Sequence, residues 1–290
     1  ASAERMFDAA LLQDSGFAMA AYYFALTSHT TRAEFIRRLR RAVSLAGRAS
    51  DRERLIIQGG WAERNNLRSL RPIGETLATR YPTEVEGHYY LGRALVNGGS
   101  FLESIAPLRR VEVMDSLSLR GKTGRCAACE SLQQQVVAYM LADSMAAAER
   151  VARRWIAARP NDWVARLVLG RILSVVNRVD EAMAAFRVSD SLDVLGRAWE
   201  PMVSLLTREG DFARADEILR REIAKGPGEG EAGPVNVNEA RGFLAISLRY
   251  QGRLEEALGE ATAFRRGGGG REHIPPGAVE LAALQEAQVL

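Results

Sequence analysis

One pattern of apolar and polar residues occurs twice along the chain. The stretch His88–Leu95 surrounds a Leu-Gly pair with apolar residues, and Arg166–Leu173 repeats it. A break follows each copy, and after the later copy a small and a large apolar residue, Ala182 and Phe186, lie four positions apart. Apolar residues three and four positions apart lie on one face of a helix. The pattern therefore predicts pairs of helices joined by short turns.

The small residues of the second helices recur at a nearly constant spacing. Ala148 and Ala182 are 34 residues apart, and Ala182 and Ala215 are 33 apart. The next interval, from Ala215 to Ala257, is 42 residues and contains a Gly- and Pro-rich stretch. A fixed period of this length is typical of a helical repeat protein. We expect loop-like interruptions near residues 117–125, 226–236 and 266–276.

The chain resembles the tetratricopeptide repeat (TPR), a helix–turn–helix unit of 34 residues. The Leu-Gly motif is present as Leu91-Gly92 and Leu169-Gly170, and Trp199 occupies the Trp position. The small-residue position of the second helix is occupied by Ala3, Ala148, Ala182, Ala215 and Ala257, and conservatively by Ser104. Local signals agree, because Ser50-Asp51-Arg52-Glu53 is a capping box that begins a helix and Pro160 follows a predicted helix end.

The resemblance implies an all-α, right-handed α-solenoid of TPR-like helix–turn–helix repeats. We predict one continuous array over residues 1–290, with five well-matched hairpins and two degenerate ones near residues 18–82. The first residues resemble a second helix without its first, and residues 277–290 a first helix without its second. The array is therefore expected to be cut within a repeat at both ends.

Charge is unevenly distributed. The net charge is +3, and 37 of the 39 basic residues are Arg. Residues 31–80 contain 12 Arg and 5 acidic residues, a local charge of +7. This segment could attract an anionic partner, or it could be a solvated helical face. No apolar stretch reaches the roughly 20 residues of a membrane span, and we expect no signal peptide.

The only two cysteines form a Cys-Ala-Ala-Cys motif at Cys126 and Cys129. Glu130 stands where a haem attachment site needs His, and a redox role would favour a βαβ context that the pattern lacks. Two readings remain beside redox or metal chemistry: two small buried thiols, or a structural disulfide at a helix start.

Catalytic residues are not evident, so we predict a protein that is not an enzyme and has no cofactor. The chain has three His residues, none near a Ser, Cys or Asp that it could activate. Gly121-Lys122-Thr123 matches the end of a phosphate-binding loop, but Ser116 stands where the first Gly belongs. No metal site is expected.

The resemblance further implies that the first helices of successive repeats line a concave groove that holds a partner segment. By register, the groove residues are Tyr89, Arg93, Asn97, Gln133, Arg171, Arg208, Arg249 and Tyr250. Arg forms paired hydrogen bonds with carboxylates and Tyr supplies rigid contact area, although the same residues could be merely solvated. We expect a protein partner with an acidic or carboxylate-bearing segment, and no nucleic acid.

The predicted function is a scaffold for protein–protein interaction. One alternative is an accessory structural subunit of a larger complex, peripherally associated with a membrane. Another is a ligand-sensing domain of a signalling protein that uses Trp155, Trp163 and Trp199. The Arg- and Ala-rich helices are similar to the repeat tails of bacterial serine/threonine kinases, adenylate cyclases and transcriptional activators. The cysteine pair favours the periplasm, with the cytoplasm as the alternative.

Overall fold

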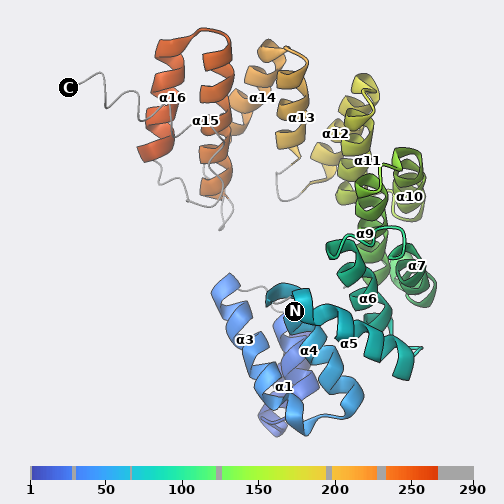
Figure 1. Cartoon of the computed structure of the whole chain (residues 1–290). Coiled ribbons are helices and arrows are strands. Elements are labelled where there is room, and N and C mark those ends of the chain that lie inside the picture. The colour runs from blue at the N-terminus through green and yellow to red at the C-terminus, as the bar shows by residue number, and fades with distance from the viewer. Residues whose placement is uncertain are drawn as a thin grey trace. The chain divides into compact units, whose positions relative to one another are not determined.

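The computed structural model describes residues 2–27, 31–65, 67–121, 126–193, 198–226 and 233–266. Regular structure in these ranges is helical, and they contain no strand (Figure 1). The predicted all-α repeat fold is confirmed. Contacts between helices group the chain into two compact units, Ala1–Pro160 and Asn161–Leu290. The continuity of one array over residues 1–290 stays a prediction.

The first unit contains ten α-helices and one short 3₁₀ turn, η1, within its described residues. The elements are α1 (Ser2–Gln13), α2 (Ala18–Thr27), α3 (Arg32–Leu45), η1 (Ala46–Arg48), α4 (Asp51–Asn65), α5 (Leu67–Arg80), α6 (Val85–Asn97), α7 (Ile105–Met114), α8 (Ser116–Arg120), α9 (Ala127–Leu141) and α10 (Met145–Ala158). The helix before Pro160 ends at Ala158, as expected from the proline.

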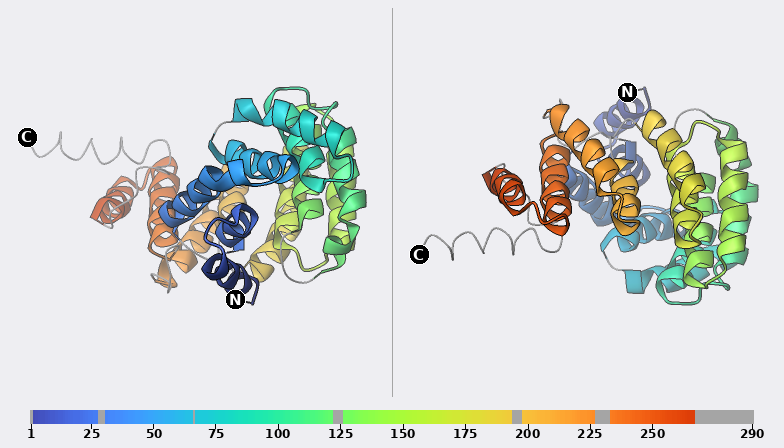
Figure 2. Two further views of the ribbon diagram at one scale, coloured as in Figure 1. Left: turned by 90° about the horizontal axis from the view of Figure 1, so that it is seen from below. Right: turned by 90° about the horizontal axis from the view of Figure 1, so that it is seen from above.

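The described part of the second unit contains six helices. They are α11 (Trp163–Val175), α12 (Val179–Leu192), α13 (Trp199–Arg208), α14 (Phe212–Ala224), α15 (Gly233–Tyr250) and α16 (Leu254–Arg266). Within each unit, successive helices lie side by side in the views of Figure 2. In the repeat register, α2, α4, α6, α9, α11, α13 and α15 are the first helices of hairpins.

The turn inside each of the five well-matched hairpins has the same backbone geometry. One residue in each turn has a positive φ: Gly99, Asp143, Asn177, Gly210 and Gly252. The next residue donates its N–H to a carbonyl five positions back, for example Ser100 to Leu95 (2.9 Å) and Arg178 to Leu173 (2.9 Å). This is the Schellman arrangement that ends a helix. Its recurrence supports the repeat register read from the sequence.

The small-residue positions lie where helices meet. Ser104, Ala148, Ala182, Ala215 and Ala257 are all fully buried. Ala3, at the corresponding position of α1, is exposed. On the first helices, a Cβ added at Gly170 would lie 2.4 Å from Cε1 of Phe186, and one at Gly92 would lie 2.6 Å from Leu108. The large side chain of one helix therefore occupies the space that the glycine of the other helix leaves. Packing of this density has no room for an additional methyl group.

Helix starts follow the local signals. At α4, the Ser50 N–H donates to Glu53 (3.0 Å) and the Glu53 N–H donates to the Ser50 hydroxyl (3.3 Å), so the predicted capping box is formed. Asp162 accepts the Val164 N–H at α11 (3.1 Å), and Asp211 accepts the Arg214 N–H at α14 (3.2 Å). Each of these bonds satisfies a backbone donor that the helix itself leaves unpaired.

Two of the predicted interruptions include residues that are helical. Residues 117–120 belong to helix α8, and residues 233–236 belong to α15. At these helical residues the loops predicted over 117–125 and 226–236 are wrong, and the rest of each loop stays a prediction. Residues 122–125, 227–232 and 267–290 lie outside the described residues, as does the helix expected at 277–290.

Candidate functional site: the faces of the first helices

The eight predicted groove residues are divided between the two units. Tyr89, Arg93 and Asn97 lie on α6 and Gln133 lies on α9, all in the first unit. Arg171 lies on α11, Arg208 on α13, and Arg249 and Tyr250 on α15, in the second unit. Each set is therefore described within its own unit.

Tyr89 belongs to the interior of the first unit and offers almost no surface to a partner. Its side chain is 2% exposed, and its hydroxyl accepts a hydrogen bond from Arg93 (3.2 Å). Burial, together with the charges of Glu63 and Glu130, raises the pKa of Tyr89 far above its usual range. Tyr89 therefore stays neutral and positions Arg93, which corrects its assignment as a contact residue.

Arg93 is held by a buried carboxylate. Its guanidinium lies 3.1 Å from Glu63 of α4, a side chain that is only 5% exposed. Arg64 also pairs with Glu63, at 2.7 Å. Burying a carboxylate costs free energy unless charged donors surround it, and here two guanidinium groups do so. The pairing connects α4 to α6 and fixes the orientation of the Arg93 side chain.

Asn97 and Gln133 are the exposed members of the first set. The Asn97 amide donates to the Arg93 carbonyl oxygen (2.9 Å), one helical turn back. Gln133 lies on α9 at a solvent-facing position. Of the four predicted residues in this unit, Asn97, Gln133 and the exposed part of Arg93 are accessible to a partner.

In the second unit, Arg171 and Arg208 differ in how firmly they are held. Arg171 is exposed on α11. Arg208 donates to the Ser174 carbonyl oxygen of α11 (3.1 Å) and pairs with Glu209 (3.1 Å). Arg208 therefore connects two successive first helices while about half of its side chain remains in solvent.

A pocket of about 450 Å³ opens between α13 and α15 and contains two of the predicted residues. It is lined by Ser204, Thr207, Arg208, Phe212, Phe243, Ile246, Ser247 and Tyr250. On α13, Thr207 and Arg208 lie three and four positions after Ser204, so these residues share one face of that helix. Arg208 and Tyr250, two of the residues that the repeat register predicts for the groove, therefore line one pocket.

Aromatic rings form much of the pocket wall. The rings of Phe212 and Tyr250 are stacked with centroids 6.3 Å apart, and Phe243 meets Trp199 edge to face at 5.7 Å. Tyr250 is 62% exposed, and the Arg249 guanidinium lies 5.5 Å from its ring. An apolar wall beside guanidinium groups suits an apolar side chain that is followed by a carboxylate.

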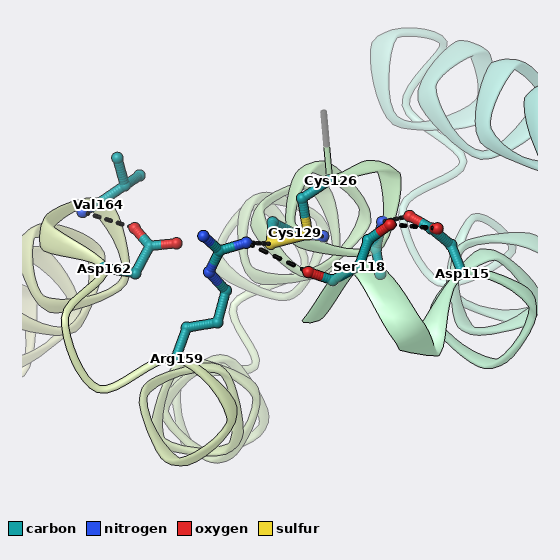
Figure 3. Close-up of a disulfide and its surroundings, with 8 residues drawn as sticks. Asp115, Ser118, Cys126, Cys129, Arg159, Asp162 and Val164 are labelled. Carbon is teal, nitrogen blue, oxygen red and sulfur yellow. Dashed lines mark hydrogen bonds between the residues drawn. A yellow bond between two sulfur atoms is a disulfide. The ribbon is translucent and has the colours of Figure 1, made fainter. Parts of the chain in front are cut away.

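The cysteine pair is a disulfide at the start of α9 (Figure 3). Cys126 and Cys129 are bonded, with their Cα atoms 5.2 Å apart. The Arg159 guanidinium, at the end of α10, donates to the Cys129 sulfur (3.3 Å) and to the Ser118 carbonyl oxygen of α8 (3.4 Å). Of the readings left open by the sequence, the structure has the disulfide and not two free thiols.

Three further possibilities from the sequence concern metal binding, membrane spanning and phosphate binding. No group of three or more His, Cys, Asp and Glu side chains in them is arranged to hold a metal ion. Among the same helices, none is both long and apolar enough to cross a membrane. Lys122 and Thr123 of the phosphate-loop-like motif lie outside the described residues.

Sequence reasoning missed three kinds of site residue. Glu63 is one of the five acidic residues in the segment 31–80, and no sequence pattern predicts its burial. Phe212, Phe243 and Ile246 have apolar side chains that the helical pattern could equally assign to the core. Arg159 is 30 residues from Cys129, and no sequence signal links them. For Phe212, the sequence signal is its position directly after the Gly210-Asp211 turn, which places it at the first residue of α14.

Comparisons with known proteins place this geometry in a class. No protein family model matches the chain, and no curated protein matches it in sequence. Among solved structures, yeast Tom70 aligns with 99% of this chain and 58% of its own, at a TM-score of 0.63 and 13% identity. The Cut9–Hcn1 hetero-tetramer of the APC/C aligns with 90% of this chain and 48% of that chain, at 0.55 and 10%.

A third similar structure is described as containing TPR-like repeats. It is a putative kinesin light chain of Podospora anserina with TPR-like repeats, and it aligns with 64% of this chain and 96% of its own. The TM-score is 0.50 and the identity is 15%. At such identities the similarity shows the fold, and the fold is that of the tetratricopeptide-repeat proteins.

Proposed function

We propose that the chain binds an extended segment of a protein partner on the faces of its first helices, and that the segment is acidic. The observation that carries the proposal is the pocket between α13 and α15, which brings Arg208 and Tyr250 together with three apolar side chains. A peptide that lies across the first helices would place an apolar residue in the pocket. A neighbouring carboxylate would then face Arg208 and Arg171.

The charge of the first unit supports the same partner. Residues 31–80 carry a local charge of +7, although most of their carboxylates are already paired with arginines, such as Glu34 with Arg38 (2.6 Å) and Glu75 with Arg71 (2.8 Å). The excess positive charge would increase the association rate of an acidic segment at low salt.

The ligand-sensing alternative has less support. Trp155 and Trp199 are 2% and 1% exposed, so both are part of the core and cannot line an open ligand site. The accessory-subunit alternative remains an outcome of the experiment below. It predicts contacts on the second helices, away from the pocket.

The test begins with the partner recovered by pull-down and identified by mass spectrometry, and then measures its affinity for purified variants at two ionic strengths. Arg171→Glu and Tyr250→Ala should each weaken binding about fivefold or more, because aromatic and Arg side chains dominate interface energetics. Affinity should also fall as salt rises, since exposed charges are screened over about 8 Å at physiological salt.

Two controls match these variants. Arg187→Glu reverses an exposed Arg on the second helix α12, and Leu254→Ala removes an apolar side chain that is as exposed as Tyr250, at 61% against 62%. Both controls should bind like the wild-type chain. A salt-independent affinity, or greater losses in the controls than in the pocket variants, contradicts binding on the first-helix faces and favours the subunit alternative.

A further inference from the structure

The two cysteines of the disulfide differ in exposure. Cys126 is partly exposed and Cys129 is 8% exposed. An incoming nucleophile can therefore reach the Cys126 sulfur more easily. The disulfide also closes a loop of only four residues, and the stabilisation expected from restricting the unfolded chain is small for so short a loop. Stabilisation of the folded state is therefore a weak explanation for this disulfide.

Both sulfurs lie where negative charge is stabilised. The backbone N–H of Cys129 points at the Cys126 sulfur (3.0 Å), so Cys126 occupies the N-cap position of α9. The Cys129 sulfur accepts a hydrogen bond from the Arg159 guanidinium (3.3 Å). A helix N-terminus and a neighbouring Arg each stabilise a thiolate relative to a thiol.

Three acidic groups lie near this site, and one of them, Asp162, is drawn beside Arg159 in Figure 3. Asp115 accepts hydrogen bonds from the Ala128 N–H (3.0 Å) and from the Ser118 hydroxyl (2.6 Å), so donors already engage both of its oxygens (Figure 3). Glu130 follows Cys129 on α9. Among the described residues near the bond, Arg159 is the one with a charged donor at a sulfur atom.

We propose that Cys126–Cys129 is a thiol–disulfide exchange site that takes two electrons from a dithiol. A thiolate of the dithiol attacks the Cys126 sulfur. The Cys126–Cys129 bond breaks as a bond forms between Cys126 and the dithiol, and the electron pair leaves on Cys129 as a thiolate beside Arg159. The second thiol of the dithiol loses its proton to solvent, and its thiolate attacks the first sulfur of the dithiol, which is bonded to Cys126. Cys126 leaves and takes a proton from solvent, and the dithiol becomes a disulfide.

Arg159 has a defined part in this sequence. The rate of exchange rises as the pKa of the leaving thiol falls. The guanidinium is positioned at the sulfur that leaves, while the more exposed sulfur is the one attacked. Arg159 is therefore a positioning residue that stabilises the Cys129 thiolate as it forms.

The experiment uses the full chain and dithiothreitol as the dithiol. The rate of reduction is followed by quenching with a maleimide mass tag, for the wild-type chain and for Arg159→Gln. Arg159→Gln should be reduced roughly threefold more slowly or slower still. Arg150→Gln is the matched control, because Arg150 is exposed on the same helix α10, and its rate should equal that of the wild-type chain.

A second readout isolates the thiol itself. In a Cys126→Ser background, the pH dependence of iodoacetamide alkylation reports the pKa of Cys129. This pKa should lie below the ordinary value of about 8.5, and Arg159→Gln should raise it. A variant that merely loosened the fold would expose the disulfide and be reduced faster, which is the opposite sign. Equal rates and equal pKa values with and without Arg159, or cysteines that stay unpaired after treatment with oxidised dithiothreitol, overturn the proposal.

Discussion

The hydroxyl groups of Tyr22 and Tyr90 lie 3.1 Å apart, although 68 residues separate them in the sequence. Tyr22 lies on α2 and Tyr90 on α6, and both rings are fully buried. Between them passes α4 with two adjacent glycines: the Tyr90 ring lies against Gly59 and the Tyr22 ring against Gly60. The missing side chains of α4 therefore let the first helices of three successive hairpins share one tyrosine pair.

The glycines of α4 should not tolerate a methyl group. A Cβ at Gly59 would lie 2.2 Å from Cε2 of Tyr90, so Gly59→Ala should lower the free energy of unfolding by about 2 kcal/mol or more through overpacking. Gly47→Ala is the control, because a Cβ there meets nothing within 4 Å. Urea unfolding followed by circular dichroism compares the two. Equal stability of both variants would show that the α4 contact is looser than described.

The tyrosine pair should be energetically coupled. The Tyr90 hydroxyl also donates to the Ile56 carbonyl oxygen (3.2 Å), so the hydrogen bonds form a short chain. A double-mutant cycle of Tyr22→Phe and Tyr90→Phe should give a coupling energy of about 0.5–1.5 kcal/mol. The measurement is the free energy of unfolding of the four proteins. Additive single-variant effects would mean that the two hydroxyls do not stabilise each other.

The small-residue position of the repeat should be intolerant of bulk. Ala182 is fully buried between helices, so Ala182→Trp should cost about 3 kcal/mol or more and disturb neighbouring repeats. Ala184 is exposed on the same helix α12, and Ala184→Trp should leave the melting temperature nearly unchanged. Thermal denaturation measures both. An unchanged melting temperature for Ala182→Trp would falsify the register.

The buried carboxylate of Glu63 should contribute more than an exposed one. Glu63→Gln leaves Arg93 and Arg64 without their shared anion and should lower the free energy of unfolding by about 2 kcal/mol. Glu75→Gln is the matched control, because Glu75 and Arg71 are both about half exposed, and its effect should stay within about 0.5 kcal/mol. Denaturant titration distinguishes them. Similar losses in both variants would contradict a special role for the Glu63 pairing.

Glu84 should make stability depend on pH. Burial, followed by the hydrogen bond and charge of Glu86, raises the pKa of Glu84 from 4.5 to about 7, while Arg52 opposes the shift. Between these values the native state holds a proton that the unfolded chain has lost, so the free energy of unfolding falls as the pH rises. Below pH 4.5 both states are protonated, and above about pH 7 the loss is complete.

Replacing this carboxyl should remove its part of the pH dependence. Glu84→Gln should therefore gain stability relative to the wild-type chain at about pH 8 and differ little from it at about pH 4. Urea titrations at both pH values measure the difference. Glu103→Gln, at an exposed position of the same unit, should follow the wild-type profile. A gain that is equal at the two pH values would exclude Glu84 as the titrating group.

The sequence alone determined the helical hairpins, their period and the small residues between them. These features are local: a helix face, a capping box or a positive-φ turn depends on residues within about five positions of one another. For this reason the register correctly predicted the burial of Ala148, Ala182, Ala215 and Ala257, and the formation of the Ser50–Glu53 capping box. The register also predicts Arg208 and Tyr250 as groove residues, and both line one pocket, while their contact with a partner stays a prediction.

Only the tertiary structure decided which distant side chains meet. Tyr89 has the register of a groove residue, yet its side chain is buried and its hydroxyl accepts a hydrogen bond from Arg93, which pairs with Glu63 of α4. Arg159 reaches the Cys129 sulfur because α10 folds back along α9, and Tyr22 reaches Tyr90 because two glycines thin the helix between them. Such contacts depend on how closely neighbouring hairpins pack, and side-chain volumes summed over several helices set that distance. A local periodic pattern does not contain this information.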